Sequence, residues 1–217
     1  SGLCGNHATM SPPLCPSLDL EHDSAMTLPH IVYLHGFLSS PATTKAQALA
    51  DALTAQGQLG LFHAPLLPVE PDAAIHAAES ALMECIDEPV LLIGSSLGGF
   101  YATWLAEHYG LKAVLVNPAV HPQLLLRHFL GAQVNPYTGV AYTLVPEHMQ
   151  ELAALDPESL RYPQRLWLLQ QSGDEVLDYR VAIDFYRDSR VTLEEGGHHA
   201  FSGFERYCPE IVNFLQL

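Results

Sequence analysis

Residues 89–104, PVLLIGSSLGGFYATW, decide the fold. The stretch opens with a continuous apolar run, which predicts a buried strand, and continues with a helical pattern as far as Tyr109. Between the two, Gly94 and Gly98 flank Ser96 two residues away on either side, in the pattern G-x-S-x-G. At a strand-to-helix junction this pattern is typical of a sharp, strained turn that lifts the serine above the sheet. The flanking glycines are needed because a Cβ atom at either position would strike the neighbouring elements.

Apolar runs and helical patterns alternate along the rest of the chain as well. Besides the strand at 89–94, we expect strands at 31–35, 60–64, 113–116, 166–170 and 190–193, and helices at 43–55, 72–86, 97–109 and 204–215. Continuous apolar strands separated by helices indicate an α/β fold: a compact, mostly parallel sheet of about six strands with helices on both faces. Residues 121–164 interrupt the alternation, and we expect them to form a small helical cap beyond the strand ends.

The first 26 residues differ from the rest of the chain. They are rich in proline and small polar residues and show no periodicity, and they lack the basic start and apolar stretch of a signal peptide. We expect residues 1–26 to be a disordered leader, in part not native, with Met26 as a possible natural start. Residues 27–217 are then expected to form a single domain, with 121–164 as its partial cap.

The charge of the chain excludes several partners. It has 24 Asp and Glu against 9 Lys and Arg, a formal net charge of −15. Such a surface repels phosphate backbones and anionic lipid, so we expect neither nucleic acid nor a membrane as a partner. No apolar run approaches the roughly 18 residues of a membrane-spanning helix. We expect a monomer or a small homo-oligomer that acts on a small molecule.

Cysteine and histidine usage bears on compartment and cofactors. The four cysteines form no C-x-x-C pair, so we interpret them as free thiols in a reducing compartment and expect a cytoplasmic protein. The chain has twelve histidines but no H-E-x-x-H or comparable ligand spacing. We therefore expect no metal site and no cofactor.

A serine nucleophile needs a base and an acid that orients the base. The loop after the last expected strand holds the adjacent residues His198 and His199, and periodicity alone does not choose between them. The chain order Ser, Asp, His then requires a carboxylate between the serine and the histidine, just past a strand. Asp174 follows the strand at 166–170 most closely, while Glu175 and Asp178 compete with it.

Two backbone donors are expected to form an oxyanion hole for a negatively charged intermediate. One is the N–H of Leu97, directly after the nucleophile, and the other is the N–H of Phe37, in the loop after the first strand. Gly36 lets that loop turn toward the site. His35 precedes it, and we expect its ring to have a structural role because the base is already assigned.

Taken together, the motifs resemble those of the YqiA-type esterases, a small α/β-hydrolase family of bacteria. The resemblance runs from Leu28 to Leu217 and rests on HGFLSSPATTKA, IGSSLGGFYATWLA, VNPAV, NPYTG, LLQQSGDEVLDY and EGGHHAFSGFE. It implies an α/β-hydrolase fold with little or no lid, and hydrolysis of carboxylic esters. The family motifs place the nucleophile at Ser96 and the acid at Asp174. They place the base immediately before Ala-Phe, which is His199.

The function expected from these residues is that of a serine esterase for short to medium acyl chains, working through an acyl-enzyme on Ser96. An acyl thioesterase would use the same three side chains, although the charge of −15 disfavours a polyanionic carrier such as coenzyme A. A non-catalytic binding protein of the same fold is the alternative from another class, since a fold by itself does not prove activity.

Overall fold

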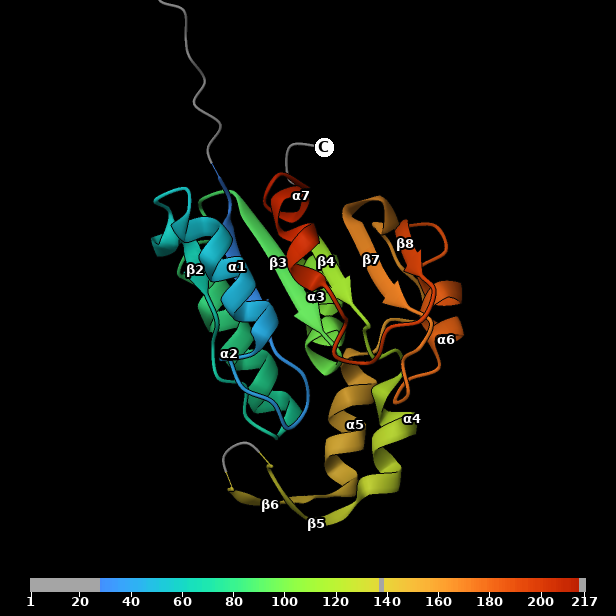
Figure 1. Ribbon diagram of the computed structural model, residues 1–217. Coiled ribbons are helices and arrows are strands. Elements are labelled where there is room, and N and C mark those ends of the chain that lie inside the picture. Colours follow the sequence, from blue (N-terminus) through green and yellow to red (C-terminus); the bar gives the residue numbers. More distant parts are fainter. Residues whose placement is uncertain (1–27, 137–138, 215–217) are drawn as a thin grey trace, which may run out of the picture.

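The computed structural model describes residues 28–136 and 139–214; the expected leader, with Met26, lies outside them. Its centre is a six-stranded sheet in the order β2-β1-β3-β4-β7-β8, in which every neighbouring pair is parallel (Figure 1). The strands are β1 (His30–Leu34), β2 (Phe62–His63), β3 (Val90–Ser95), β4 (Lys112–Val116), β7 (Leu166–Gln171) and β8 (Arg190–Glu194). The predicted parallel sheet is confirmed.

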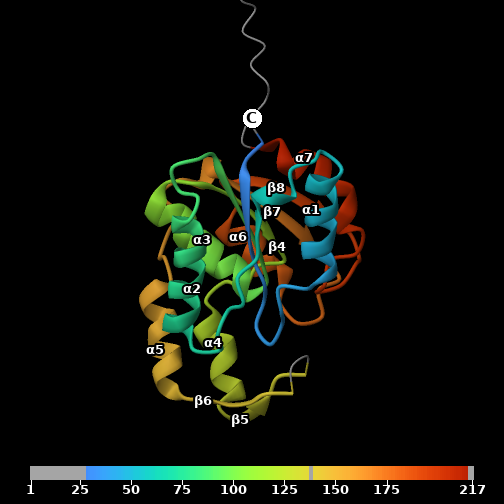
Figure 2. The ribbon, with the colours of Figure 1, turned by 90° about the vertical axis from the view of Figure 1, so that its left-hand side faces the viewer.

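Helices cover both faces of this sheet, as Figure 2 shows edge-on. The bounds are α1 (Thr44–Thr54), α2 (Pro71–Met83), α3 (Leu97–Tyr109), α6 (Tyr179–Phe185) and α7 (Cys208–Val212). Successive strand residues point to opposite faces. In β1, Ile31 and Tyr33 pack in one core with α1 and α7, while Val32 and Leu34 pack in the other with α2, α3 and α6. The central strands β1, β3, β4 and β7 are therefore buried on both sides, which explains their continuous apolar sequences. The edge strand β8 exposes Val191 and Leu193 instead.

The segment 121–164 extends beyond the carboxyl ends of the strands (Figure 1). It contains two helices, α4 (Pro122–Leu126) and α5 (Pro146–Leu155), where a small helical cap was expected. Between them lies an antiparallel pair that the sequence did not indicate, β5 (Gly131–Val134) and β6 (Ala141–Leu144). These strands have only four residues each and begin with a glycine or an alanine, so they lack the long β-branched run that predicts a strand.

Three other elements differ from the sequence-based expectation. The first part of the expected strand at 60–64 is a 3-10 turn, Leu59–Leu61, which leaves β2 with two residues. The expected helix at 204–215 starts as a separate 3-10 turn, Phe204–Tyr207, because Pro209 has no N–H with which to continue a helix from that turn. The short helix α6 was missed, although Asp178 caps its first turn by accepting from the Arg180 N–H.

The strand-to-helix turn brings backbone against backbone. A Cβ atom added to Gly94 would lie 2.2 Å from the carbonyl oxygen of Gly98. One added to Gly98 would lie 2.0 Å from the carbonyl oxygen of Leu34, in β1. Both distances are far shorter than a non-bonded contact, so these positions accept only glycine unless α3 moves off the sheet.

Gly98→Ala is expected to destabilise the fold by more than about 3 kcal/mol, since the added methyl group meets rigid backbone rather than a mobile side chain. Gly60→Ala is the matched control, because nothing lies within 4 Å of a Cβ atom there. Urea denaturation of both variants measures the difference. Equal denaturation midpoints for the two variants would show that α3 can move off the sheet with little loss of stability.

Candidate active site

Ser96 lies at the junction of β3 and α3 in a conformation that few non-glycine residues adopt, with φ 55° and ψ −122°. Backbone hydrogen bonds hold it there. Its N–H donates to the carbonyl of Val116 at 3.1 Å, and its carbonyl accepts from the N–H groups of Gly99 at 2.9 Å and Ala119 at 3.0 Å. The strain is thus balanced by surrounding contacts, and the side chain stands at the carboxyl edge of the sheet.

The structure brings Ser96, His199 and Asp174 together in one chain of hydrogen bonds. His199 Nε2 lies 3.0 Å from Ser96 Oγ, and His199 Nδ1 lies 2.8 Å from Asp174 Oδ2. A neutral imidazole that donates from Nδ1 to the carboxylate leaves Nε2 free to accept the serine proton. The order along the chain, Ser, Asp, His, is that of the strand-to-helix serine turn.

The carboxylate of Asp174 is held by several donors at once. Its side chain is fully buried, and Oδ1 accepts from the N–H groups of Val176 and Leu177, each at 2.9 Å. Desolvation by burial raises the pKa of Asp174, but the hydrogen bonds from His199, Leu177 and Val176 outweigh it, so the pKa lies below its ordinary value. The group therefore stays a carboxylate at neutral pH, facing the imidazole.

The competing residues have other partners. Glu175 accepts from the backbone N–H of His199 at 2.9 Å, and Asp178 pairs with the Arg180 guanidinium at 2.8 Å. The backbone N–H of His198 donates to the Gln171 side chain at 3.2 Å. The contacts of Glu175 and His198 support the histidine loop, while the imidazole of His199 faces both Asp174 and Ser96.

A buried asparagine that the sequence analysis did not single out anchors the histidine loop. Asn117 follows β4 directly, is fully buried and has a positive φ of 40°. Its Nδ2 donates to the carbonyls of His198 at 3.1 Å and His199 at 2.9 Å, and its Oδ1 accepts from the Gln171 N–H at 2.9 Å. Its position in the sequence could have indicated this role, because a polar residue directly after a parallel strand lies at the carboxyl edge of the sheet, where ligand sites form.

Two more buried side chains hold the same loop. Gln171 Oε1 accepts from the N–H groups of His198 at 3.2 Å and Ser202 at 2.9 Å, and its Nε2 donates to the Ser202 carbonyl at 2.9 Å. Lys45, at the start of α1, donates from Nζ to the carbonyl of Ala200 at 2.7 Å. The loop that carries the imidazole is thereby bonded to β4, β7 and α1.

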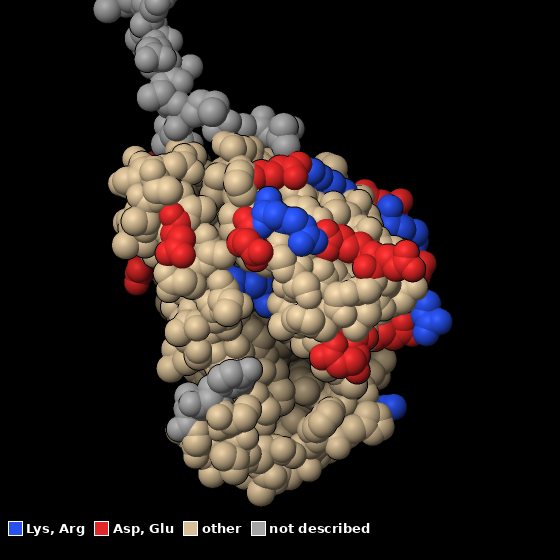
Figure 3. Space-filling model, viewed as in Figure 1, with Lys and Arg blue, Asp and Glu red and all other residues tan. Residues whose placement is uncertain are grey.

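An apolar cavity of about 490 Å³ opens beside Ser96 and His199. Residues of the 121–164 segment form one wall, and loop residues of the main body form the other. The apolar lining includes Phe37, Pro122, Leu125, Leu126, Phe129 and Val176. On the face in Figure 3, charged side chains gather over the main body, and a hollow separates it from the largely uncharged 121–164 segment.

The loop after β1 lies against the serine. A Cβ atom on Gly36 would come within 3.0 Å of Ser96 Cβ, and both Phe37 and Leu97 line the cavity. His35 is buried, as expected of a structural residue: its Nδ1 lies 2.9 Å from the Gly36 carbonyl, and its Nε2 accepts from the Leu67 N–H at 3.0 Å. Burial lowers its pKa, which keeps the ring neutral.

The parallel sheet, the serine turn after β3 and the Ser-His-Asp arrangement define an α/β-hydrolase fold. Solved structures agree: mouse alpha/beta hydrolase domain-containing protein 10 superposes with a TM-score of 0.65 at 17% identity, over 86% of this chain and 89% of that one. The Est1E protein of Butyrivibrio proteoclasticus, with ferulic acid bound, gives a TM-score of 0.62 at 14% identity, over 87% and 88%.

The sequence comparison identifies the family. The model of the uncharacterised protein family UPF0227 matches residues 30–216. A UPF0227 protein of Shewanella sp. (strain ANA-3) is 24% identical over 187 residues, which span 85% of this chain and 98% of that protein. The chain belongs to the UPF0227 family, which is the YqiA family. Among the residues that the structure describes, no helix is long and apolar enough to cross a membrane.

The buried amine of Lys45 is expected to make stability depend on pH. Burial lowers its pKa from 10.5 to about 8. The unfolded chain therefore binds the additional proton between about pH 8 and about pH 10.5, so the contribution of this group to stability rises with pH through that window. Across this pH window, the free energy of unfolding of the parent protein should rise by on the order of 3 kcal/mol relative to that of Lys45→Met.

Chemical denaturation of both proteins at several pH values measures this difference. All other groups titrate alike in the two proteins, so the difference between the curves isolates Lys45. Parallel curves across the window would mean that Lys45 is solvated as freely in the folded protein as in the unfolded chain.

Proposed function

We propose that the protein is a serine-dependent carboxylic ester hydrolase for short to medium acyl chains. The observation that carries the proposal is the imidazole of His199, which lies 3.0 Å from Ser96 Oγ and 2.8 Å from a buried Asp174 carboxylate. These are the distances at which a general base can take the proton of a hydroxyl nucleophile. The serine also opens into a cavity, where a substrate can reach it.

The reaction proceeds in two acyl transfers. His199 Nε2 takes the Ser96 proton as Oγ forms a bond to the ester carbonyl carbon, and the carbonyl oxygen becomes an oxyanion. The tetrahedral intermediate collapses, the bond to the alcohol oxygen breaks, and His199 returns the proton to the leaving alcohol. Water then attacks the acyl-enzyme by the same route, releasing the carboxylic acid and restoring the Ser96 hydroxyl. Asp174 stays ionised and stabilises the imidazolium form of His199.

The oxyanion is assigned to the backbone N–H groups of Leu97 and Phe37. Leu97 is the first residue of α3, whose amino-terminal N–H groups favour negative charge. Phe37 lies in the loop that passes against Ser96, and it lines the same cavity. Two such preorganised donors typically contribute several kcal/mol to stabilising an acyl-transfer transition state.

The acyl chain is assigned to the apolar side of the cavity. Leu125, Leu126 and Phe129 come from the 121–164 segment, and Val176 comes from the loop of Asp174. Burying apolar chain there contributes about 0.8 kcal/mol for each methylene group. The fold likeness to Est1E, a protein solved with ferulic acid bound, is consistent with a carboxylic acid or its ester as the ligand.

Hydrolysis of a p-nitrophenyl ester series from acetate to palmitate tests the proposal. We expect turnover of the shorter chains, its loss in Ser96→Ala, and a fall of about 10⁴-fold in kcat in Asp174→Asn, because an amide at that position selects the wrong imidazole tautomer. Asp178→Asn is the matched control, since an asparagine can still cap α6.

Turnover that persists in Ser96→Ala would remove this serine from the mechanism. Faster hydrolysis of a thioester than of an oxygen ester with the same acyl chain would reassign the protein as a thioesterase. Failure of Ser96 to react with a fluorophosphonate probe in the folded protein would favour a binding protein, because only an activated serine reacts quickly.

Asn117 is expected to act as a positioning residue. Asn117→Ala removes the amide that donates to the carbonyls of His198 and His199, on either side of the His199 Cα, so the imidazole loses its fixed place. A displacement of about 1 Å costs on the order of 100-fold in rate. We expect a fall of that size in kcat and in fluorophosphonate labelling, with KM little changed. Asn213→Ala is the matched control, since Asn213 also donates to a backbone carbonyl, that of Pro209.

An unchanged labelling rate in folded Asn117→Ala would show that the other contacts suffice to hold the loop. A loss of stability without a change in kcat would assign Asn117 a purely structural role. Circular dichroism establishes that each variant is folded before its rate is compared.

A further inference from the structure

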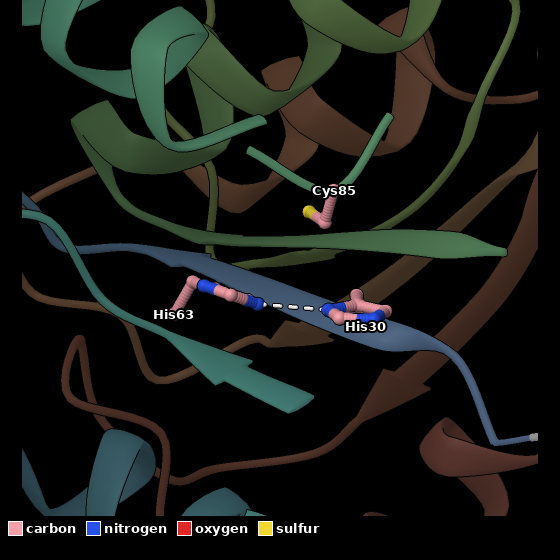
Figure 4. Close-up of side chains that lie close together, drawn as sticks. All are labelled: His30, His63 and Cys85. Carbon is pink, nitrogen blue, oxygen red and sulfur yellow. Dashed lines mark hydrogen bonds between the residues drawn. The ribbon is translucent and has the colours of Figure 1, made fainter. Parts of the chain in front are cut away.

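Three side chains with metal-binding chemistry, His30, His63 and Cys85, lie close together (Figure 4). His30 is the first residue of β1, His63 is the last residue of β2, and Cys85 follows the end of α2. One ligand atom of each lies within 4.8 Å of the others, and His30 Nδ1 is 2.9 Å from His63 Nε2. The two histidines are half-buried and the cysteine is buried.

The register of the sheet explains this meeting. Val32 pairs with His63 across β1 and β2, and residues two apart on a strand point to the same face, so His30 and His63 share a face. Cys85 and Val32 belong to the same core cluster, which α2 covers. The three residues thus come from separate elements, and their spacing along the chain resembles no ligand motif.

The imidazoles of His30 and His63 face each other through one hydrogen bond. At 2.9 Å, one facing nitrogen donates and the other accepts, so only one proton lies between the rings. Two charged imidazoles at this distance would turn N–H groups toward each other, so the pair disfavours double protonation, and a divalent cation can replace the shared proton.

We propose that His30, His63 and Cys85 bind one Zn²⁺ ion. Two imidazole nitrogens and a thiolate are the ligands that Zn²⁺ prefers. Tetrahedral bonds of about 2.0–2.1 Å to nitrogen and about 2.3 Å to sulfur place the ligand atoms about 3.3–3.6 Å apart. The two nitrogens must separate by a few tenths of an ångström, and the sulfur must approach them by a rotation of its side chain.

The protons balance on binding. The histidine that donates in the pair moves its proton to its other ring nitrogen, so both facing nitrogens offer a lone pair. Cys85 binds as a thiolate and releases one proton to water. The fourth position is left to water or to the Glu84 carboxylate, which is exposed and interacts electrostatically with both His63 and Cys85.

The role of the ion is structural. His30 lies at the amino end of β1, whereas Ser96 lies at the carboxyl edge of the sheet, so the ion cannot contact the acyl chemistry. It would tie the two-residue edge strand β2 to β1 and to the end of α2. Such a tie stabilises the weakest pairing of the sheet by binding the folded chain and not the unfolded one. The proposal is independent of the proposed function.

Metal binding to the full chain tests the site. Because residues 1–27 include Cys4, His7, Cys15 and His22, all variants are made in a background in which both cysteines are replaced by serine and both histidines by glutamine. Zn²⁺ affinity is measured by competition with a chromophoric chelator, and Co²⁺ is the spectroscopic probe. We expect one ion per chain, a tetrahedral Co²⁺ spectrum with a thiolate charge-transfer band, release of one proton, and a Tm that rises with Zn²⁺.

Single substitutions then locate the ion. His63→Gln and Cys85→Ala should each abolish the rise in Tm and weaken Zn²⁺ binding. The loss of affinity should exceed the about 10–100-fold that is typical when a residue outside the ligand set is replaced. His76→Gln, an exposed histidine on α2, and Cys208→Ala, the other described cysteine, are the matched controls and should bind as the parent does. If Cys85→Ala fails to fold, His30→Gln replaces it.

Unchanged stoichiometry and affinity in His63→Gln and Cys85→Ala would overturn the proposal. So would a Co²⁺ spectrum without the thiolate band, or no saturable binding by the parent. Ester hydrolysis is measured alongside with and without Zn²⁺. A parent that binds Zn²⁺ but hydrolyses no ester counts against the proposed function alone, and one that hydrolyses esters but binds no Zn²⁺ counts against the metal site alone.

Discussion

Where β3 passes into α3, the backbone of Gly98 lies so close to Leu34 that no Cβ atom fits between them. This approach sets the position of α3 over the sheet, and with it the strained conformation of Ser96. The loop after β1 also passes close to Ser96, because Gly36 has no side chain to occupy the narrow space between them. The position of Ser96, the start of α3 and the proposed oxyanion donors therefore depend on one backbone-to-backbone contact.

A second set of contacts places His199, the proposed general base. Phe201 packs the loop that carries His199 into the core, and buried polar side chains hold the backbone of that loop. Asn117 just after β4, Gln171 from β7 and Lys45 from α1 each bond to its backbone. Buried polar groups must be satisfied, so each of these contacts also limits where the loop can lie. The result is an imidazole fixed between a hydroxyl and a carboxylate.

The two ends of the sheet carry different groups of side chains. The carboxyl ends of the parallel strands meet the amino end of α3 and the 121–164 segment, which together leave an apolar cavity beside Ser96. Near the amino end of β1, the short edge strand β2 has only two paired residues, and His63 lies there beside His30 and Cys85. Chemistry at one end and a structural ion at the other would leave the reaction independent of the metal.

The sequence by itself determined the alternating strands and helices, the serine turn and its glycines, because these follow from local periodicity and local backbone geometry. It also predicted that Ser96, Asp174 and His199 would meet, since parallel strands end at one edge; the choice of His199 over His198 needed the family resemblance. Only the tertiary structure decided the roles of Asn117 and Lys45, the β5–β6 pair, and the contact of His30 with His63 and Cys85. These depend on strand register and on which loops cross which edge, and such long-range geometry leaves no periodic mark in the chain.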